Sequence, residues 1–333
     1  MDVPVWVWLV TVVVILAMLA VDFVGHARVP HAPSMRESAW WSAGYVAVAL
    51  VFGLVVWTGW GGGYAGEYFA GYITEKSLSV DNLFVFVLIM ATFRVPRLLQ
   101  QKVLLLGITV ALVLRTIFIL LGAALVENFS WVFYLFGAFL LWTAWSQLKH
   151  ARSGEDEEYR ENGFLRLVRR TLPVTEDYVE GHMVVRRAGR WFVTPLLVVM
   201  LAIGSADLLF AVDSIPAIFG LTQETYLVFA ANAFSLLGLR QLYFLIDGLL
   251  DRLVFLAYGL AAILGFIGVK LVLHALHTNE LPFVNGGEHV DVPEISTAFS
   301  LGYIVVVLAI TTLLSLWADH RRRELAAPAR KDA

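Results

Sequence analysis

Long runs of apolar residues alternate with short polar segments along most of the chain. About 20 apolar residues suffice for a helix to cross the roughly 30 Å hydrocarbon core of a bilayer. Nine runs reach or approach this length, and we expect each to form a membrane-spanning helix; the seventh is the shortest. They cover residues 3–21, 43–60, 73–93, 103–125, 131–148, 192–215, 225–238, 253–273 and 298–317.

Composition supports this interpretation. The 333-residue chain is 59% hydrophobic, with a mean hydropathy of +0.75, which excludes an ordinary soluble domain. We therefore predict an all-α polytopic membrane protein forming a single membrane domain, 1–333. The sequence has no Cys, which excludes disulfides, thiolate metal sites and CxxC redox chemistry. It begins without a basic segment, so we expect no cleavable signal peptide.

The distribution of positive charge predicts an orientation. Of 24 Lys and Arg residues, only Lys76, Arg115 and Lys270 lie in or at the edge of a predicted span. The others fall in alternate loops, and the positive-inside rule places such loops in the cytoplasm. We therefore expect a multi-pass protein of the cytoplasmic membrane, with its N-terminus outside and its C-terminus in the cytoplasm. The charged segment 149–190 is then a cytoplasmic linker with room for a short interfacial helix.

Two acidic segments interrupt the apolar pattern. Glu75-Lys-Ser-Leu-Ser-Val-Asp-Asn82 and Asp207-Leu-Leu-Phe-Ala-Val-Asp-Ser214 each contain two acids six residues apart, and the copies are offset by 132 residues. A carboxylate in a membrane helix costs a few kcal/mol, so it usually faces a cavity or a partner and marks an ion pathway. We expect a divalent-cation site built from these segments, with ligands Glu75, Asp81, Asn82, Asp207, Asp213 and Ser214.

Each acidic segment opens a group of three predicted spans, within 64–148 and 191–273. Two N-terminal helices (1–60) and a C-terminal helix (298–317) flank these groups. An odd number of spans per group inverts the second copy, as in many secondary transporters with a site near the membrane midplane. Chance similarity is one alternative. Another is a register with an offset of 126, which aligns Ser79 and Asp81 with Ser205 and Asp207.

Helical geometry separates the acids within each segment. Residues seven apart share a helix face, so Glu75 lies above Asn82 while Asp81 points elsewhere. Pro216 lacks an N–H and frees the Val212 carbonyl beside Asp213, so an unwound helix could bring that acid inward. We expect Asp81 and Asp213 at the centre of the site. Glu75 should lie nearer the outer mouth, and Asp207 nearer the inner one.

Other polar residues in the spans are candidates for supporting roles. An unpaired Arg115 would be costly, so it should pair with an acid, Asp81 first, as a structural or a mobile counter-ion. Asn232 could give an oxygen to the site or make a helix–helix hydrogen bond. The simplest interpretation of Lys76 and Lys270 is that their side chains snorkel to the membrane surface.

These segments resemble the paired signature of the TerC family of integral membrane proteins. Glu75 to Asn82 and Asp207 to Ala217 carry the resemblance, supported by Gly238-Leu-Arg-Gln-Leu-Tyr-Phe244 and Gly268-Val-Lys270. It extends over about 41–273. The resemblance implies manganese efflux, tellurite resistance in some members, and a broader group of cation exporters built from two three-helix repeats. Carried over by position, the resemblance makes Glu75, Asp81, Asp207 and Asp213 the acidic residues of the family's motif.

We therefore expect a secondary transporter that exports a divalent cation, Mn²⁺ first and Ca²⁺ as the alternative. Oxygen ligands suit Mg²⁺, Ca²⁺ or Mn²⁺. Export of a 2+ ion against 100 mV requires about 4.6 kcal/mol, and carboxylates that accept protons as metal leaves favour proton antiport. The expected partners are the metal cation, protons and the lipid bilayer. We expect no nucleic acid and no permanently bound cofactor.

Two other functions remain open at this stage. A membrane scaffold or assembly factor of the tellurite-resistance type would use the acids only to hold Arg115 and Lys76, and a Ca²⁺/H⁺ exchanger would differ only in its ion. We expect no enzyme, because no Walker motif or usable nucleophile–base pair is visible. His274, His277 and Glu280, with His289 in the next loop, have a spacing that would permit metal capture at the outer end.

Overall fold

The computed structural model describes most of the chain. Its described residues are 1–27, 33–129, 131–153, 170, 173–175, 177–179, 181–187, 190–246, 255–279, 281–282 and 284–326. Within these ranges, the side chains of 26, 27, 81, 84, 153, 187, 246, 320 and 322–326 are outside the description.

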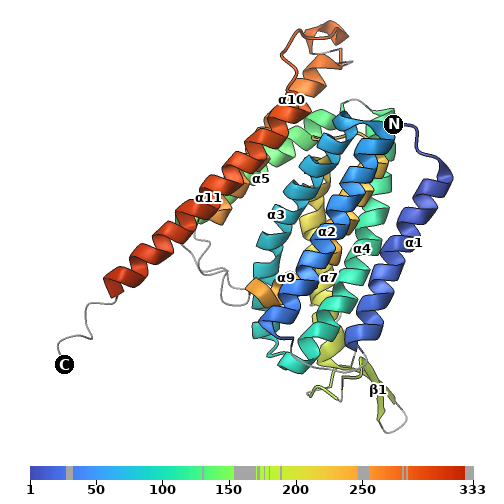
Figure 1. Ribbon diagram of the computed structural model, residues 1–333, viewed down its shortest axis with the longest axis vertical. Coiled ribbons are helices and arrows are strands. Elements are labelled where there is room, and N and C mark those ends of the chain that lie inside the picture. The colour runs from blue at the N-terminus through green and yellow to red at the C-terminus, as the bar shows by residue number, and fades with distance from the viewer. Residues whose placement is uncertain are drawn as a thin grey trace.

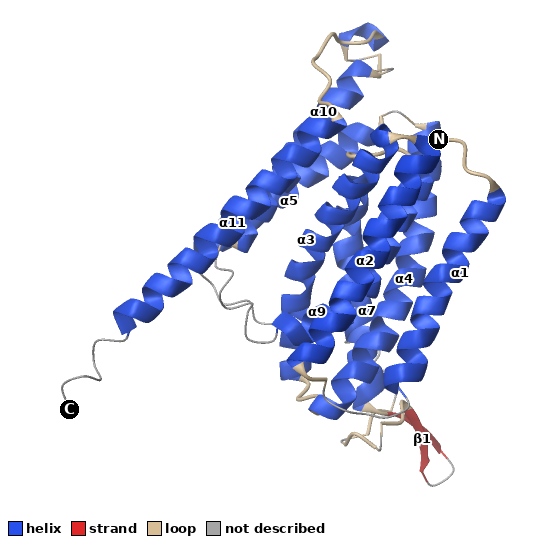
Figure 2. Ribbon diagram, in the orientation of Figure 1, coloured by secondary structure: helices blue, strands red, loops and turns tan. Residues whose placement is uncertain are grey.

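Helices make up nearly all of the ordered structure (Figure 2). The longer ones are α1 (Val5–Asp22), α2 (Met35–Trp60), α3 (Gly62–Thr92), α4 (Arg97–Asn128), α5 (Val132–Ser153), α7 (Pro195–Phe219), α8 (Thr225–Leu237), α9 (Leu239–Ile246), α10 (Leu256–His277) and α11 (Thr297–Ala326). A π-helical segment, Phe23–Ala27, follows α1, and a 3-10 turn, Asn285–Gly287, lies between α10 and α11. Strands β1 (Val184–Arg187) and β2 (Arg190–Val193) pair antiparallel as one hairpin.

Within the described residues, seven helical segments are long and apolar enough to cross a membrane. They are α1, α2, α4, α7, α8 joined to α9 as Thr225–Leu245, α10 and α11. This confirms a multi-pass, all-α membrane protein. Helices also form over the third and fifth predicted spans, but α3 and α5 are not among the seven. The charged residues Glu67, Glu75, Lys76 and Asp81 explain why α3 is not counted, because they leave no stretch of 18 residues in it with two or fewer charges. The prediction of nine crossings stays a prediction.

The structure corrects two local expectations. The sixth span was expected to begin at residue 192, but β2 extends to Val193 and α7 begins at Pro195. Proline favours the first helical turn, where its missing N–H has no partner to lose. Pro216 lies inside α7, which remains a continuous helix from Pro195 to Phe219. The expected unwinding beside Asp213 is therefore wrong for this conformation.

The helices form an upright bundle with three leaning helices at its side. Figure 1 shows α1 to α4 and α7 roughly parallel, while α5, α10 and α11 lean away together. The N-terminus and the α10–α11 connection lie at one end, and the β1–β2 hairpin lies at the other. Three helix pairs pack extensively: α5 with α10, α4 with α7, and α3 with α8. Each pair joins one helix from 64–148 to one from 191–273.

Small residues allow these pairs to approach closely. At the crossing of α5 and α10, a Cβ on Gly137 would lie 3.0 Å from the Gly268 carbonyl oxygen. A Cβ on Gly268 would lie 3.1 Å from the Gly137 carbonyl oxygen. Neither position can accept a side chain without movement of backbone. Such small-residue contacts are common where membrane helices associate.

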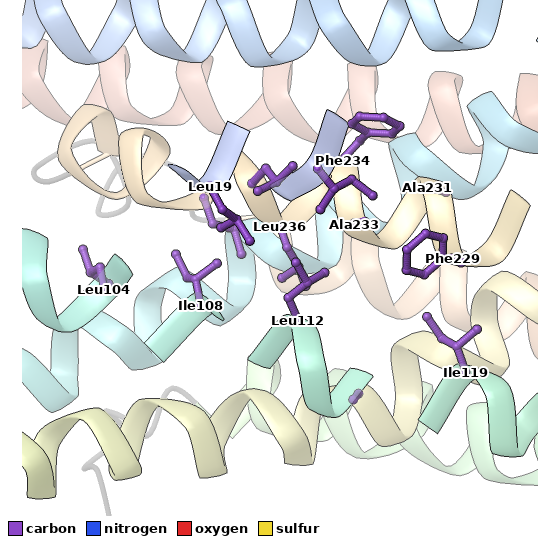
Figure 3. Close-up of a cluster of buried hydrophobic side chains, with 14 of the residues drawn as sticks. Leu19, Leu104, Ile108, Leu112, Ile119, Phe229, Ala231, Ala233, Phe234 and Leu236 are labelled. Atoms are coloured by element: carbon purple, nitrogen blue, oxygen red, sulfur yellow. The ribbon is translucent and has the colours of Figure 1, made fainter. Parts of the chain in front are cut away.

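An apolar cluster fills the space between α4 and α8. Figure 3 shows Leu112 pointing toward Leu236 and Ile119 toward Phe229. Leu112 and Ile119 are seven residues apart and share one face of α4, as Phe229 and Leu236 share one face of α8. Arg115 lies between Leu112 and Ile119 in sequence, so this packing fixes the level of its helix turn.

Candidate metal centre

One arginine joins the two acidic segments in the middle of the bundle. Arg115 of α4 donates from Nε to Asp207 Oδ2 over 2.8 Å and from Nη2 to Asp207 Oδ1 over 3.1 Å. Its Nη1 donates to Glu75 Oε1 and, over 3.1 Å, to Ser214 Oγ. A two-point contact between guanidinium and carboxylate is among the stronger hydrogen-bonded pairs in proteins. Arg115 thus holds α3 and α7 together through one side chain.

This network is fully enclosed. The side chains of Arg115 and Glu75 are 0% exposed, and that of Asp207 is 1% exposed. Enclosed charges are tolerated only when they are paired and hydrogen-bonded. Two carboxylates share one guanidinium here, so with both acids ionised the group carries a net negative charge. The partly exposed Asp213 lies within electrostatic range of Glu75 and Arg115 and can add to it.

Arg115 pairs with acids, as expected, and its described partners are Asp207, Glu75 and Ser214. Asp81 was the first choice from sequence. The side chain of Asp81 is outside the described residues, so its pairing with Arg115 and its place in the predicted site stay predictions. The expected depths need correction. A single guanidinium contacts both Glu75 and Asp207, so these acids lie at one level and not at opposite mouths.

The remaining site candidates divide between the interior and the outside of the bundle. Ser79 and Asn82 are buried on α3, 0% and 5% exposed. Ser205 lies elsewhere: its hydroxyl donates to the Ala202 carbonyl oxygen over 3.0 Å, and it lines an apolar groove between α4 and α7.

Several buried polar atoms near this network have no hydrogen-bond partner in the described part of the chain. Each such atom costs about 1–3 kcal/mol relative to a satisfied one. Sequence patterns did not single out Thr74 or Ser235, because a hydroxyl in an apolar helix usually bonds to its own backbone. The atoms are Thr74 Oγ1, Glu75 Oε2, Ser79 Oγ, Asn82 Nδ2, both amide atoms of Asn232, and Ser235 Oγ.

Lys76 does not snorkel as expected. Its Nζ donates to the Ser235 carbonyl oxygen of α8 over 3.1 Å and lies against Gly238. The lysine therefore points between helices of the bundle and ties α3 to the break between α8 and α9.

The end of the bundle that carries the N-terminus contains a cavity of about 460 Å³ that the sequence did not reveal. Glu67, Glu224, Lys270 and His274 are among its lining residues, and Thr222 donates to Glu67 Oε2 over 2.6 Å. His274 Nε2 lies 2.7 Å from Gln223 Nε2.

The histidines near this end form no metal centre in the described structure. His277 Nε2 lies 3.5 Å from Glu294 Oε1, and His289 is exposed. Glu280 is outside the described residues. The described residues contain no group of three or more His, Cys, Asp or Glu side chains arranged to hold a metal ion. A cation in the Arg115 network would therefore need amide, hydroxyl or backbone oxygens as well.

Comparison with known proteins agrees with this architecture. Residues 60–323 match the integral membrane protein TerC family. The chain is 53% identical over 322 residues to the membrane protein Rv2723 of Mycobacterium tuberculosis, covering 96% of this chain and 81% of the relative. It is 38% identical over 325 residues to Alx of Salmonella typhi, covering 93% and 94%; Alx carries the provisional description of a membrane-bound redox modulator. No solved structure matches. The chain belongs to the integral membrane protein TerC family.

Proposed function

We propose that this protein is a secondary transporter that exports a divalent metal cation, Mn²⁺ first, from the cytoplasm by proton antiport. The observation that carries the proposal is the meeting of Glu75 and Asp207 inside the bundle. These acids come from separate halves of the chain, and both are enclosed among apolar helices. Buried acids of this kind in membrane helices typically mark ion pathways.

The packing of the two halves supports an inverted repeat. In an inverted repeat, α3, α4 and α5 of 64–148 correspond to α7, α8 and α10 of 191–273. Exchanging the two groups therefore turns the α4–α7 pair into the α3–α8 pair and leaves the α5–α10 pair unchanged, and these are the three pairs that pack extensively. Glu75 and Asp207 are 132 residues apart, and the glycines that meet at the α5–α10 crossing are 131 apart. Two residues that occupy equivalent positions in repeats related by a two-fold axis lie close together only where they are near that axis, as both of these pairs are. The 132 register therefore fits this packing better than the 126 register, which aligns Asp207 with Asp81.

The chemistry of the network suits a hard cation and a proton exchange. Carboxylate, amide and hydroxyl oxygens are ligands for Mn²⁺, Mg²⁺ and Ca²⁺. In the proposed cycle, Arg115 acts as the counter-ion that keeps the acids charge-balanced when no metal is present. Metal binding requires deprotonated acids, so metal release and protonation are coupled. Because the chain has no Cys, a redox role through thiols of this protein is not available.

A test in cells uses Asp213, which lies beside the network without the hydrogen bonds that Arg115 makes to Asp207. Cells expressing Asp213→Asn should retain more Mn²⁺ than cells with the wild-type protein at equal membrane abundance. An exposed acid near the end of α4, changed as Glu127→Gln, is the control and should behave as wild type. Equal manganese content in Asp213→Asn and wild-type cells would contradict the site as proposed.

One observation favours a second candidate, a membrane scaffold without transport. Arg115 engages both oxygens of Asp207, which is what a purely structural ion network would require. This candidate predicts that the purified protein moves no metal in vesicles. It also predicts that Glu75→Asp and Asp207→Glu, which keep the charge, leave function in cells intact.

A further inference from the structure

Asn232 of α8 is the clearest unexplained polar group in the bundle. Its side chain is 1% exposed, and neither Oδ1 nor Nδ2 has a hydrogen-bond partner among the described residues. The helix–helix hydrogen bond expected as one alternative is therefore not formed in this conformation. A buried amide with both groups unsatisfied needs an explanation, such as a ligand that the structure does not contain.

The contacts of α8 show where Asn232 points. Ala231 faces α3, since a Cβ on Gly71 would lie 3.4 Å from the Ala231 Cβ. Phe229 and Leu236 face α4 (Figure 3). With about 100° of rotation per residue, Asn232 projects between the α3 and α4 directions. Phe234, on nearly the opposite side, packs against Phe52 of α2 with ring centroids 4.9 Å apart. Asn232 therefore points into the bundle.

The same contacts fix the level of Asn232. On α3, Gly71 lies level with Ala231 of α8, and Lys76 reaches the Ser235 carbonyl oxygen of α8. Glu75 lies between these two contacts, so it is level with the turn of α8 between Ala231 and Ser235. On α4, Leu112 and Ile119 lie opposite Leu236 and Phe229, which places Arg115 at the level of that same turn. Asn232 thus projects toward the contact between Glu75 and Arg115. There Glu75 Oε2 is also without a partner among the described side chains.

We propose that Asn232 is a direct ligand of the transported divalent cation, binding it through Oδ1 together with Glu75 Oε2. Arg115 engages both Asp207 oxygens and Glu75 Oε1, so of these two acids only Glu75 Oε2, on α3, stays open to a cation in this conformation. A neutral amide oxygen beside a carboxylate favours hard divalent cations. The assignment rests on the proposed transport function and adds a residue outside both acidic segments.

Asn232→Leu provides the main test, because leucine has a similar volume and removes both unsatisfied groups. Full-length wild type, Asn232→Leu and Asn232→Asp are compared by Mn²⁺-dependent thermal stability in detergent and by Mn²⁺ flux in vesicles. Gln101→Leu is the matched control, since Gln101 of α4 is also a buried amide, 3% exposed, with Oε1 unpartnered in the described structure. It lies at the inner end of α4, away from the network.

We expect the apparent Mn²⁺ affinity of Asn232→Leu to fall at least about tenfold, the lower limit for groups that support a metal site. Its melting temperature without metal should be unchanged or higher. Asn232→Asp should keep Mn²⁺ binding, and Gln101→Leu should match wild type. An Asn232→Leu protein with wild-type Mn²⁺ affinity and a lowered metal-free melting temperature would overturn the assignment and make Asn232 a packing residue. Wild-type protein that neither binds nor moves any divalent metal would instead refute the transport function itself.

Discussion

Replacing Arg115 with leucine tests the enclosed ion network most sharply. Arg115→Leu removes the only donor shown for Glu75 Oε1 and for both Asp207 oxygens in the described structure. Removing one partner of a buried ion pair typically costs about 3–5 kcal/mol, because the remaining charge has no compensation. Two acids lose their counter-ion here, although protonation of one would recover part of the loss. We expect the free energy of unfolding to fall by about 3–5 kcal/mol.

The measurement is unfolding of the purified full-length protein in mild detergent by titration with sodium dodecyl sulfate, followed by fluorescence of its 11 tryptophans. Arg190→Leu is the control, because Arg190 is exposed on β2 and such surface changes usually stay within about 0.5 kcal/mol. A double-mutant cycle that combines Arg115→Leu with Asp207→Asn should give a coupling energy of about 0.5–3 kcal/mol. A loss below about 1 kcal/mol for Arg115→Leu, or strict additivity in the cycle, would refute the network. Under the transport proposal, excess Mn²⁺ should stabilise Arg115→Leu more than wild type.

Three further predictions follow from other contacts. Gly137→Val should weaken the α5–α10 crossing by about 1–3 kcal/mol through overpacking, measured by the same unfolding titration, and wild-type stability would contradict the close approach of Gly137 and Gly268. Asp22→Leu leaves Arg240 without its 2.8 Å partner and should cost about 3–5 kcal/mol; Asp22→Asn, which keeps an oxygen for Arg240, should cost less, and equal losses would argue against this ion pair. Tyr68→Phe removes a 3.1 Å hydrogen bond to the Ala49 carbonyl oxygen and should cost about 1 kcal/mol; no loss would show that this bond adds nothing.

Sequence patterns predicted the helices well because hydrophobic length and the cost of buried charge act locally. They failed at the start of α7, where Trp191-Phe192-Val193 continues the apolar run but belongs to β2. Pro195 was the available signal for that boundary. They also treated α8 as a short span, because Gly238 separates it from α9.

The site was only partly predictable for a geometric reason. Spacing within one helix gives the relative direction of its side chains, but the rotation and level of neighbouring helices come from packing. Glu75 and Asp207 were identified as a pair from their repeated motif, whereas their meeting at Arg115 depends on how α4 docks against α3 and α7. The direction of Asn232 likewise depends on the small residues Gly71 and Ala231 that set the α3–α8 contact.

Metal flux in vesicles reconstituted with the purified full-length protein tests the central claim most directly. Mn²⁺, Ca²⁺, Mg²⁺, Zn²⁺ and Fe²⁺ are offered separately, with and without a pH gradient, to wild type and to Glu75→Gln. The transport account predicts Mn²⁺ movement that a pH gradient accelerates and that Glu75→Gln abolishes. Folded wild-type protein that moves none of the five ions under either condition would contradict it.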